Sequence, residues 1–215
     1  LRKETGIVAA APPMPVALIK SIPVPIGLIR SFRDAVSADG DAPKEGWGIA
    51  AVNATKTELT GKGVIVALLD TGIDATHAAF KGVELIRQNF TKEADDDNDG
   101  HGTHCAGTFF GRDVDGHRIG IARGVSKALI GKVIGKNGGS TEQIVKAIAW
   151  VQSSGAQVIS MSLGLDFIAY QKMLQTDYGM KEQQAISFAL VGYRDNVRLF
   201  DKISNVTSSN GAILN

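Results

Sequence analysis

The feature that most constrains the fold is a continuous apolar run, Val64–Leu69, that ends at the carboxylate of Asp70. A short run without polar alternation is typical of a strand that is buried on both faces. Such strands occur in parallel sheets that helices cover on both sides. Asp70 would then lie at the C-terminal end of a buried strand, where open α/β sheets place their active sites. An Asp before Thr-Gly can also be no more than a turn or a helix cap.

Strand and helix patterns alternate along the chain from residue 46. Apolar runs predict strands over 64–69, 83–90, 128–134 and 158–163, and the intervening patterns predict helices over 101–110 and 140–155. Ser140 and Gln143 match a capping box at the start of the second helix. This order predicts the fold class α/β, with a doubly wound, mostly parallel sheet flanked by helices.

Composition divides the chain into four segments. Residues 1–45 hold all six prolines, so this N-terminal arm, a surface linker or a remnant of a propeptide, should contain little regular structure. Residues 46–165 carry the α/β pattern. Residues 205–215 turn polar at Ser208 and Ser209 and then resemble the start of a further strand. The remaining segment, 166–204, predicts a long amphipathic helix, because apolar residues recur at helical spacing at Ile186, Leu190, Tyr193, Val197 and Phe200.

The charge balance disfavours several kinds of partner. The 215 residues carry 23 basic and 22 acidic side chains, a net charge of +1, so nothing favours nucleic acid or an anionic membrane. No apolar run approaches the roughly 20 residues of a membrane span. Cys105 is the single cysteine, which rules out an internal disulfide and leaves the cellular compartment open.

A second candidate site lies at His101 and His104, within the stretch 99–108. Two histidines three positions apart can ligate a metal, but no His-Glu-x-x-His pattern is present, and His77 and His117 are isolated. We therefore expect no catalytic metal. A single histidine can also be a core residue whose ring is hydrogen-bonded.

Taken together, the two stretches resemble the subtilisin-like serine protease (subtilase) family. The resemblance rests on Asp70-Thr71-Gly72, followed later in the chain by His101-Gly102-Thr103-His104. It extends to flanking stretches in the family's order, at 61–70, 120–125 and 158–164. The match covers roughly residues 46–164, which the resemblance identifies as the N-terminal part of a subtilisin-like catalytic domain.

The resemblance implies a serine endopeptidase that hydrolyses peptide bonds with an Asp-His-Ser triad. His101 would be the general base, and Asp70 would fix its tautomer. The substrate-binding residues carried over from the family are Ser162, Leu163 and Gly164 on one edge of a groove and Gly138 and Gly139 on the other. An extended peptide between these edges would add a strand. Substrates would be proteins or peptides, catalysis would need no cofactor, and a secreted or extracytoplasmic location is favoured.

The family's pattern is incomplete in this sequence. No Gly-Thr-Ser motif supplies a nucleophile after the histidine, and the family's oxyanion-hole Asn is absent as well. We therefore expect the nucleophilic Ser and the C-terminal part of the domain, this chain's remaining partner, to lie after Asn215, and the 215 residues alone to be inactive. The alternative is a natural half-domain without catalysis, a pseudoprotease that binds peptides or proteins. An unrelated α/β module with chance motifs is disfavoured by the joint match.

Three features stay open at this point. The helical segment 166–204 can be a surface insertion, a lid over the cleft or a docking surface. The acidic run Asp95–Asp99 is interpreted as a solvated turn, and an EF-hand is rejected because Ala106 stands where the bidentate Glu is needed. Since subtilases often bind calcium in other loops, the resemblance leaves a structural calcium ion as an option. Cys105 is interpreted as a packing residue that can confer mercury sensitivity, not as a nucleophile.

Overall fold

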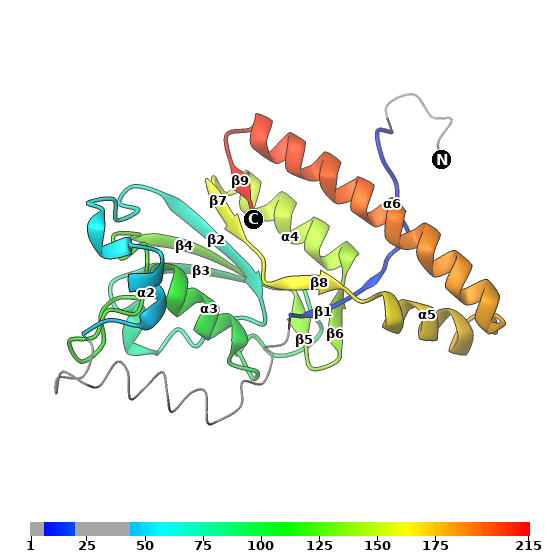
Figure 1. Ribbon diagram of the computed structural model, residues 1–215, viewed down its shortest axis with the longest axis horizontal. Coiled ribbons are helices and arrows are strands. Elements are labelled where there is room, and N and C mark those ends of the chain that lie inside the picture. Colours follow the sequence, from blue (N-terminus) through cyan, green and yellow to red (C-terminus); the bar gives the residue numbers. More distant parts are fainter. Residues whose placement is uncertain (1–6, 20–43) are drawn as a thin grey trace.

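The computed structural model describes residues 7–19 and 44–215, and Figure 1 shows their arrangement. The strands are β1 Pro15–Leu18, β2 Ile65–Asp70, β3 Glu84–Asn89, β4 Lys127–Lys132, β5 Ile134–Gly135, β6 Gly138–Ser140, β7 Val158–Ser160, β8 Leu163–Leu165 and β9 Ile213–Leu214. The α-helices are α2 Trp47–Ala51, α3 His101–Phe110, α4 Thr141–Ser153, α5 Phe167–Thr176 and α6 Glu182–Ser209. Two short 3-10 helices span Ala54–Lys56 and Ala78–Phe80.

The larger sheet has five strands in the order β3-β4-β2-β7-β9, and all its pairings are parallel. β2 alternates its side chains between two cores, as a strand buried on both faces must. Val66 and Leu68 share a buried cluster with Phe110 of α3. Ala67 and Leu69 share another cluster with buried residues of α4, so helices cover both faces of the sheet (Figure 1). The predicted α/β class with a parallel sheet flanked by helices is confirmed.

The smaller sheet is antiparallel and contains a strand of the N-terminal arm. Its order is β5-β6-β1-β8, so β1 lies between β6 and β8. Residues 15–18 therefore form a strand that the sequence did not predict within an arm expected to have little regular structure. Proline is tolerated there because Pro15 is the first residue of the strand. The remainder of the arm, residues 1–6 and 20–43, lies outside the described residues.

The chain leaves the parallel sheet earlier than the sequence predicts. The expected strand 158–163 ends at Ser160, and the next residues turn into β8 of the antiparallel sheet. The segment after it is two helices, α5 and α6, and α6 continues through Ser209. Ser208 and Ser209 are thus the last residues of a helix, and the turn follows them at Asn210 and Gly211.

α4 begins as the sequence predicts. Ser140 is its N-cap, and the side chains and backbone N–H groups of Ser140 and Gln143 form the reciprocal capping box. Among the described residues, no helix has both the length and the apolar character needed to cross a membrane.

Candidate active site

The centre of the site is a hydrogen bond between Asp70 and His101. Asp70 is the last residue of β2 and is fully buried, and His101 is the first residue of α3. The Nδ1 atom of His101 lies 2.7 Å from Oδ1 of Asp70, which also accepts the N–H of Thr71 at 2.7 Å. Oδ2 of Asp70 is buried and has no hydrogen-bond partner in the described part of the chain. Burial raises the pKa of Asp70 above its usual value, although the hydrogen bonds from His101 and Thr71 oppose the shift.

This geometry defines which nitrogen of His101 is free to act. When Nδ1–H donates to Asp70, the other ring nitrogen, Nε2, carries the lone pair and can accept a proton. The His101 side chain is 24% exposed, whereas that of Asp70 is 0% exposed. The ring of His101 is therefore accessible to a substrate at the end of the sheet, whereas the carboxylate of Asp70 is shielded from solvent.

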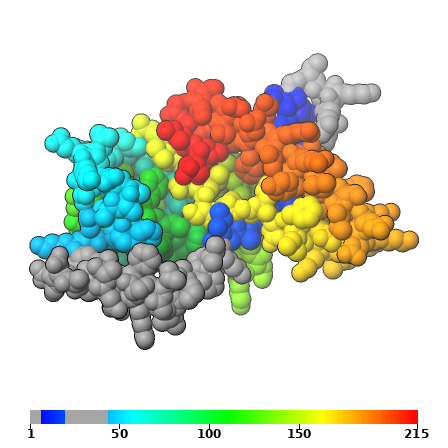
Figure 2. Space-filling view, viewed as in Figure 1, coloured from blue at the N-terminus to red at the C-terminus, as the bar shows by residue number. Residues whose placement is uncertain are grey.

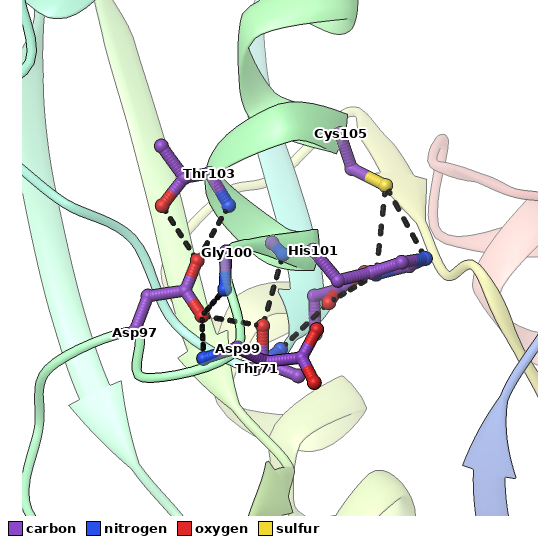
Figure 3. Close-up of polar contacts among 9 residues, drawn as sticks. Thr71, Asp97, Asp99, Gly100, His101, Thr103 and Cys105 are labelled. Carbon is purple, nitrogen blue, oxygen red and sulfur yellow. Dashed lines mark hydrogen bonds and ion pairs between the residues drawn. The ribbon is translucent and has the colours of Figure 1, made fainter. Parts of the chain in front are cut away.

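Asp97 ties the end of β2 to the first turn of α3 (Figure 3). Its Oδ1 accepts the hydroxyl of Thr71 at 2.8 Å and the N–H of Gly100 at 2.9 Å. Its Oδ2 accepts the N–H and the hydroxyl of Thr103 at 2.8 and 2.5 Å. The Thr71 hydroxyl oxygen in turn accepts the N–H of Gly102 at 2.9 Å. Asp97 thereby fixes the relative position of the two elements that carry Asp70 and His101.

The hydrogen bonds also keep Asp97 ionised. Burial acts to raise its pKa, but the donors on Thr103, Gly100 and Thr71 together hold the pKa of Asp97 below its usual value. The interpretation of the acidic run as a solvated turn is therefore wrong at this position. The same loop is anchored by Lys132, whose buried ammonium donates to the carbonyls of Ala94 and Asp96 at 2.8 and 2.6 Å.

Replacing Asp97 by alanine is expected to disturb catalysis without removing a reacting group. The hydroxyls of Thr71 and Thr103 and the N–H groups of Gly100 and Thr103 lose their acceptor, and the helix that carries His101 is free to shift against β2. A misplacement of about 1 Å can cost roughly 10²-fold in rate, so we expect a loss of that order in kcat of the complete protein. Asp96→Ala is the matched control, because the Asp96 side chain is exposed. Equal activity of Asp97→Ala and Asp96→Ala would contradict this role.

Cys105 lies one turn after His101 on α3 and faces the same pair. Its Sγ is 3.7 Å from Nδ1 and 3.9 Å from Nε2 of His101. Burial, followed by the nearby charge of Asp70, raises the pKa of the Cys105 thiol, so the thiolate that a nucleophile requires is disfavoured. In the part of the chain that the structure describes, Asp70, His101 and Cys105 are the one group whose ligand atoms lie close enough, within 4.8 Å, to hold a metal ion.

This group predicts sensitivity to a soft metal ion. We expect stoichiometric Hg²⁺ to displace the thiol proton of Cys105 and to block the Asp70–His101 pair, since thiolate sulfur is a soft ligand. The measurement is hydrolytic activity of the complete protein with and without Hg²⁺. Cys105→Ala should retain activity and resist the ion. Equal inhibition of both forms would place the mercury target elsewhere.

The residues predicted to form the groove lie on both sides of β1. The register pairs Val16 with Gly139 of β6, and pairs Ala17 with Gly164 and Leu18 with Leu163 of β8. Gly138 begins β6, and Ser162 immediately precedes β8. The two predicted edges are thus brought together around an extended peptide segment, which is the chain's own arm. Figure 2 shows this arm, in blue, at the surface beside the yellow segment that contains β8.

The groove is continuous with the Asp70–His101 pair. A cavity of about 890 Å³ is lined by Ala17 and Leu18 of the arm, by Gly138, and by Thr71, the neighbour of Asp70. On the opposite edge, Ser162 immediately precedes β8 and lies close enough to the Cys105 thiol to influence its pKa, so this edge is beside the helix that carries His101. An extended segment in this groove runs toward the potential base.

Sequence analysis did not identify two further groups that contact the arm. Thr141 exchanges hydrogen bonds with Met14: the N–H of Met14 donates to the Thr141 hydroxyl at 3.0 Å, and the N–H of Thr141 donates to the Met14 carbonyl at 2.9 Å. Asn196 of α6 donates its side-chain N–H to the carbonyl of Pro12 at 3.0 Å. Neither residue belongs to a sequence motif. A polar residue in a helix indicates a contact with another segment only when it is buried, and the sequence alone does not show that burial.

Comparison with known proteins agrees with this geometry. The sequence model described as "Subtilase family" matches residues 61–200. Subtilisin-like protease 6 of Trichophyton equinum is 34% identical, with a match that covers 55% of this chain and 32% of that protein. Subtilisin-like protease 6 of Trichophyton rubrum is 35% identical with the same two shares.

A solved structure is also similar to part of the chain. It is fervidolysin from Fervidobacterium pennivorans, described as a keratinolytic enzyme related to subtilisin, with 28% sequence identity and a TM-score of 0.46. The match covers 55% of this chain and 20% of fervidolysin. The chain spans about a third of the length of the curated relatives it matches.

Proposed function

The chain belongs to the subtilase family, and from that premise we propose that the complete protein is a serine endopeptidase with Asp70 and His101 as two members of its triad. Membership of the family supports the serine peptidase class, and the activity and the roles of these residues are our proposal. The nucleophilic Ser is proposed to lie outside the 215 residues, since no serine hydroxyl among the described residues is hydrogen-bonded to the His101 ring.

The observation that carries the proposal is the arm strand beside the Asp70–His101 pair. Residues 15–18 form an extended peptide with partners on both sides, and Ala17 and Leu18 line the same cavity as Thr71. A groove that holds a peptide by main-chain pairing selects for extended chains of many sequences, as an endopeptidase requires. The edges that hold the strand contain the glycines and the Ser-Leu-Gly segment predicted for substrate.

The proposed chemistry follows from the two side chains. Nε2 of His101 removes the proton of the serine hydroxyl as the oxygen attacks the scissile carbonyl carbon, and the same nitrogen then gives that proton to the leaving amine. Asp70 holds Nδ1–H and stabilises the imidazolium that forms in between. Water then attacks the acyl-enzyme ester with the same base, which releases the acid and restores the serine.

The test is active-site labelling of the complete protein with a fluorophosphonate, together with hydrolysis of an unstructured protein such as casein. We expect one labelled serine and measurable hydrolysis, and both should be lost in His101→Ala. His104→Ala is the matched control, because this histidine is exposed on the same helix. Hydrolysis that survives in His101→Ala would refute the proposal. We also expect the 215 residues alone to give neither labelling nor hydrolysis.

A peptide-binding pseudoprotease is the second candidate, since the arm strand by itself is a binding observation. It predicts that the complete protein binds extended peptides but that no serine reacts with the fluorophosphonate. A secreted or extracytoplasmic location and a structural calcium ion are further parts of the first proposal. A chelator that leaves the melting temperature of the complete protein unchanged would count against the calcium ion.

A further inference from the structure

Helices α5 and α6 hold the arm at the first residue of β1 and just before it. The N–H of Asp166, the N-cap of α5, donates to the carbonyl of Pro15 at 2.9 Å. Farther along, the Asn196 amide of α6 binds the Pro12 carbonyl, and Asn196 is 0% exposed. With the two bonds between Met14 and Thr141, the main chain of residues 12–15 is held by three helices or their caps, up to and including the first residue of β1.

The side chain of Met14 fills an apolar pocket in this region. Met14 is 0% exposed and shares a buried cluster with Tyr170 and Leu174 of α5 and with Ala185 and Ala189 of α6. The two alanines leave the space that the thioether occupies, and unbranched Met suits an irregular pocket between two helices.

A neighbouring position on α6 is equally adapted to a close approach. A Cβ atom on Gly192 would lie 2.7 Å from the ring of Tyr170 and 3.3 Å from the ring of Pro12. A larger residue at 192 would push both the α5 aromatic ring and the arm away. The facing sides of α5 and α6, which together form a wall of the groove, therefore leave space for a peptide backbone and its side chains.

The arm does not use all the polar groups of this wall. Pro12, Pro13 and Pro15 have no N–H, and Oδ1 of Asn196 is buried without a partner in the described part of the chain. A substrate peptide with an N–H in this stretch could donate to Oδ1 of Asn196, which the arm leaves unpaired.

We propose that α5 and α6 form an apolar peptide subsite that extends the groove and accepts a Met- or Leu-sized side chain of the substrate. The substrate residue whose side chain this subsite binds lies four residues before the residue that pairs with Leu163. In the arm, Met14 likewise lies four residues before Leu18. This inference rests on the proposed peptidase function. It gives the segment 166–204 the role of a binding wall at one end of the groove, in place of a lid.

The first test measures binding, so it does not depend on hydrolysis. Fluorescent peptides with the sequence of residues 10–19 are titrated into the complete protein carrying His101→Ala, and anisotropy gives the apparent Kd. We expect the Met peptide to bind at least about tenfold more tightly than peptides with Asp or Gly in place of Met, given the apolar area buried. The chain's own arm competes equally with every peptide, so it leaves these ratios unchanged.

The pocket side of the contact is tested with a matched pair on α6. Ala189→Phe fills the pocket and should abolish the preference for Met, whereas Phe188→Ala, at a position 60% exposed, should keep it. Equal affinity for all peptides would overturn the subsite whether or not the protein hydrolyses casein. A preference for the Met peptide in a protein whose wild-type form does not hydrolyse casein would support the subsite and contradict the peptidase proposal.

A second measurement covers the case in which the arm excludes every added peptide. Amide hydrogen exchange of Val16, Ala17 and Leu18 is compared in wild type, Met14→Asp and Met14→Leu of the complete protein. Burial of a carboxylate in this apolar pocket is unfavourable, so Met14→Asp should speed exchange by about tenfold or more. Met14→Leu should exchange at nearly the wild-type rate. Unchanged exchange in Met14→Asp would show that the pocket does not anchor a peptide.

Discussion

Asp70→Asn in the complete protein is expected to lower kcat by about 10⁴-fold while the fold is retained. An asparagine that presents its NH₂ group to Nδ1 of His101 favours the tautomer with the proton on Nε2, and that tautomer cannot accept the serine proton. The 2.7 Å contact with Asp70 is much shorter than the 3.7 Å contact of Nδ1 with the Cys105 sulfur, so Asp70 is the group that sets the tautomer of His101 in the wild-type protein. The measurement is kcat on a peptide substrate; a loss of less than tenfold would remove Asp70 from the proposed triad.

The same substitution has a stability effect whose sign follows from the pKa. Burial raises the pKa of Asp70, so the folded protein binds this proton more tightly than the unfolded chain does. The contribution of Asp70 to stability is therefore present below its unfolded pKa and is lost as the pH rises through the folded pKa. Asparagine does not titrate, so the melting temperature of Asp70→Asn minus that of wild type should increase as the pH rises from below the unfolded pKa through the raised folded pKa.

Asp74→Asn is a control with the opposite sign. The hydroxyl and N–H of Thr76 lower the pKa of Asp74, so its contribution is present at neutral pH and is lost as the pH falls through the folded pKa. The difference in melting temperature between Asp74→Asn and wild type should therefore become more negative toward neutral pH. A parallel pH dependence of the two variants would contradict the assignment of either shift.

The parallel sheet could be predicted because its signals are local. The run that ends at Asp70 is too apolar for an exposed strand, and Ser140 with Gln143 marks the start of α4 through contacts within one turn. Asp70 and His101 followed from the resemblance, and their 2.7 Å contact agrees with it. Their proposed roles still depend on the activity measurements.

The buried face of α6 could not be predicted from its apolar residues. The stripe expected to pack inward includes Ile186, Leu190 and Val197, which are 41%, 41% and 46% exposed. The face that packs instead carries Ala185 and Ala189, with Gly192 and Asn196. Close approach to α5 and to the arm requires small side chains there, so hydrophobicity does not identify this face, although Phe200 of the stripe does pack against the core. The identity of the packing partner decides the face, and that partner is distant in sequence.

The strand in the arm was missed for a related reason. Proline disfavours a strand in the interior of a sheet, and Pro15 is the first residue of the segment that pairs. The pairing is decided by two edges more than 120 positions away, since Val16 meets Gly139 on one side and Leu165 on the other. The groove imposes the extended conformation, as it would on a substrate, and propensity within the arm has little influence.

Gly102→Ala is the second substitution with a large expected effect, because Gly102 is where the two catalytic elements touch. A Cβ atom there would overlap the carbonyl oxygen of Gly72 and would lie 3.1 Å from both the Gly72 nitrogen and the Thr71 hydroxyl. The overlapping atom is backbone, so α3 itself must move away from the end of β2. That movement carries His101 away from Asp70, and it breaks the bond from the Gly102 N–H to Thr71.

We expect Gly102→Ala to lower kcat by at least about 10²-fold and to destabilise the protein by roughly 1–3 kcal/mol. Gly107→Ala is the control on the same helix, because its added Cβ meets only the Cδ1 atom of Ile119, at an ordinary 3.9 Å. Alanine is the better helix former by up to about 1 kcal/mol, so Gly107→Ala should be neutral or stabilising. Kinetics and thermal unfolding of both variants separate loss of site geometry from a general effect of alanine in α3. If Gly102→Ala behaved like Gly107→Ala, contact between the helix and the strand would not set the position of His101, and Asp97 alone would have to hold it.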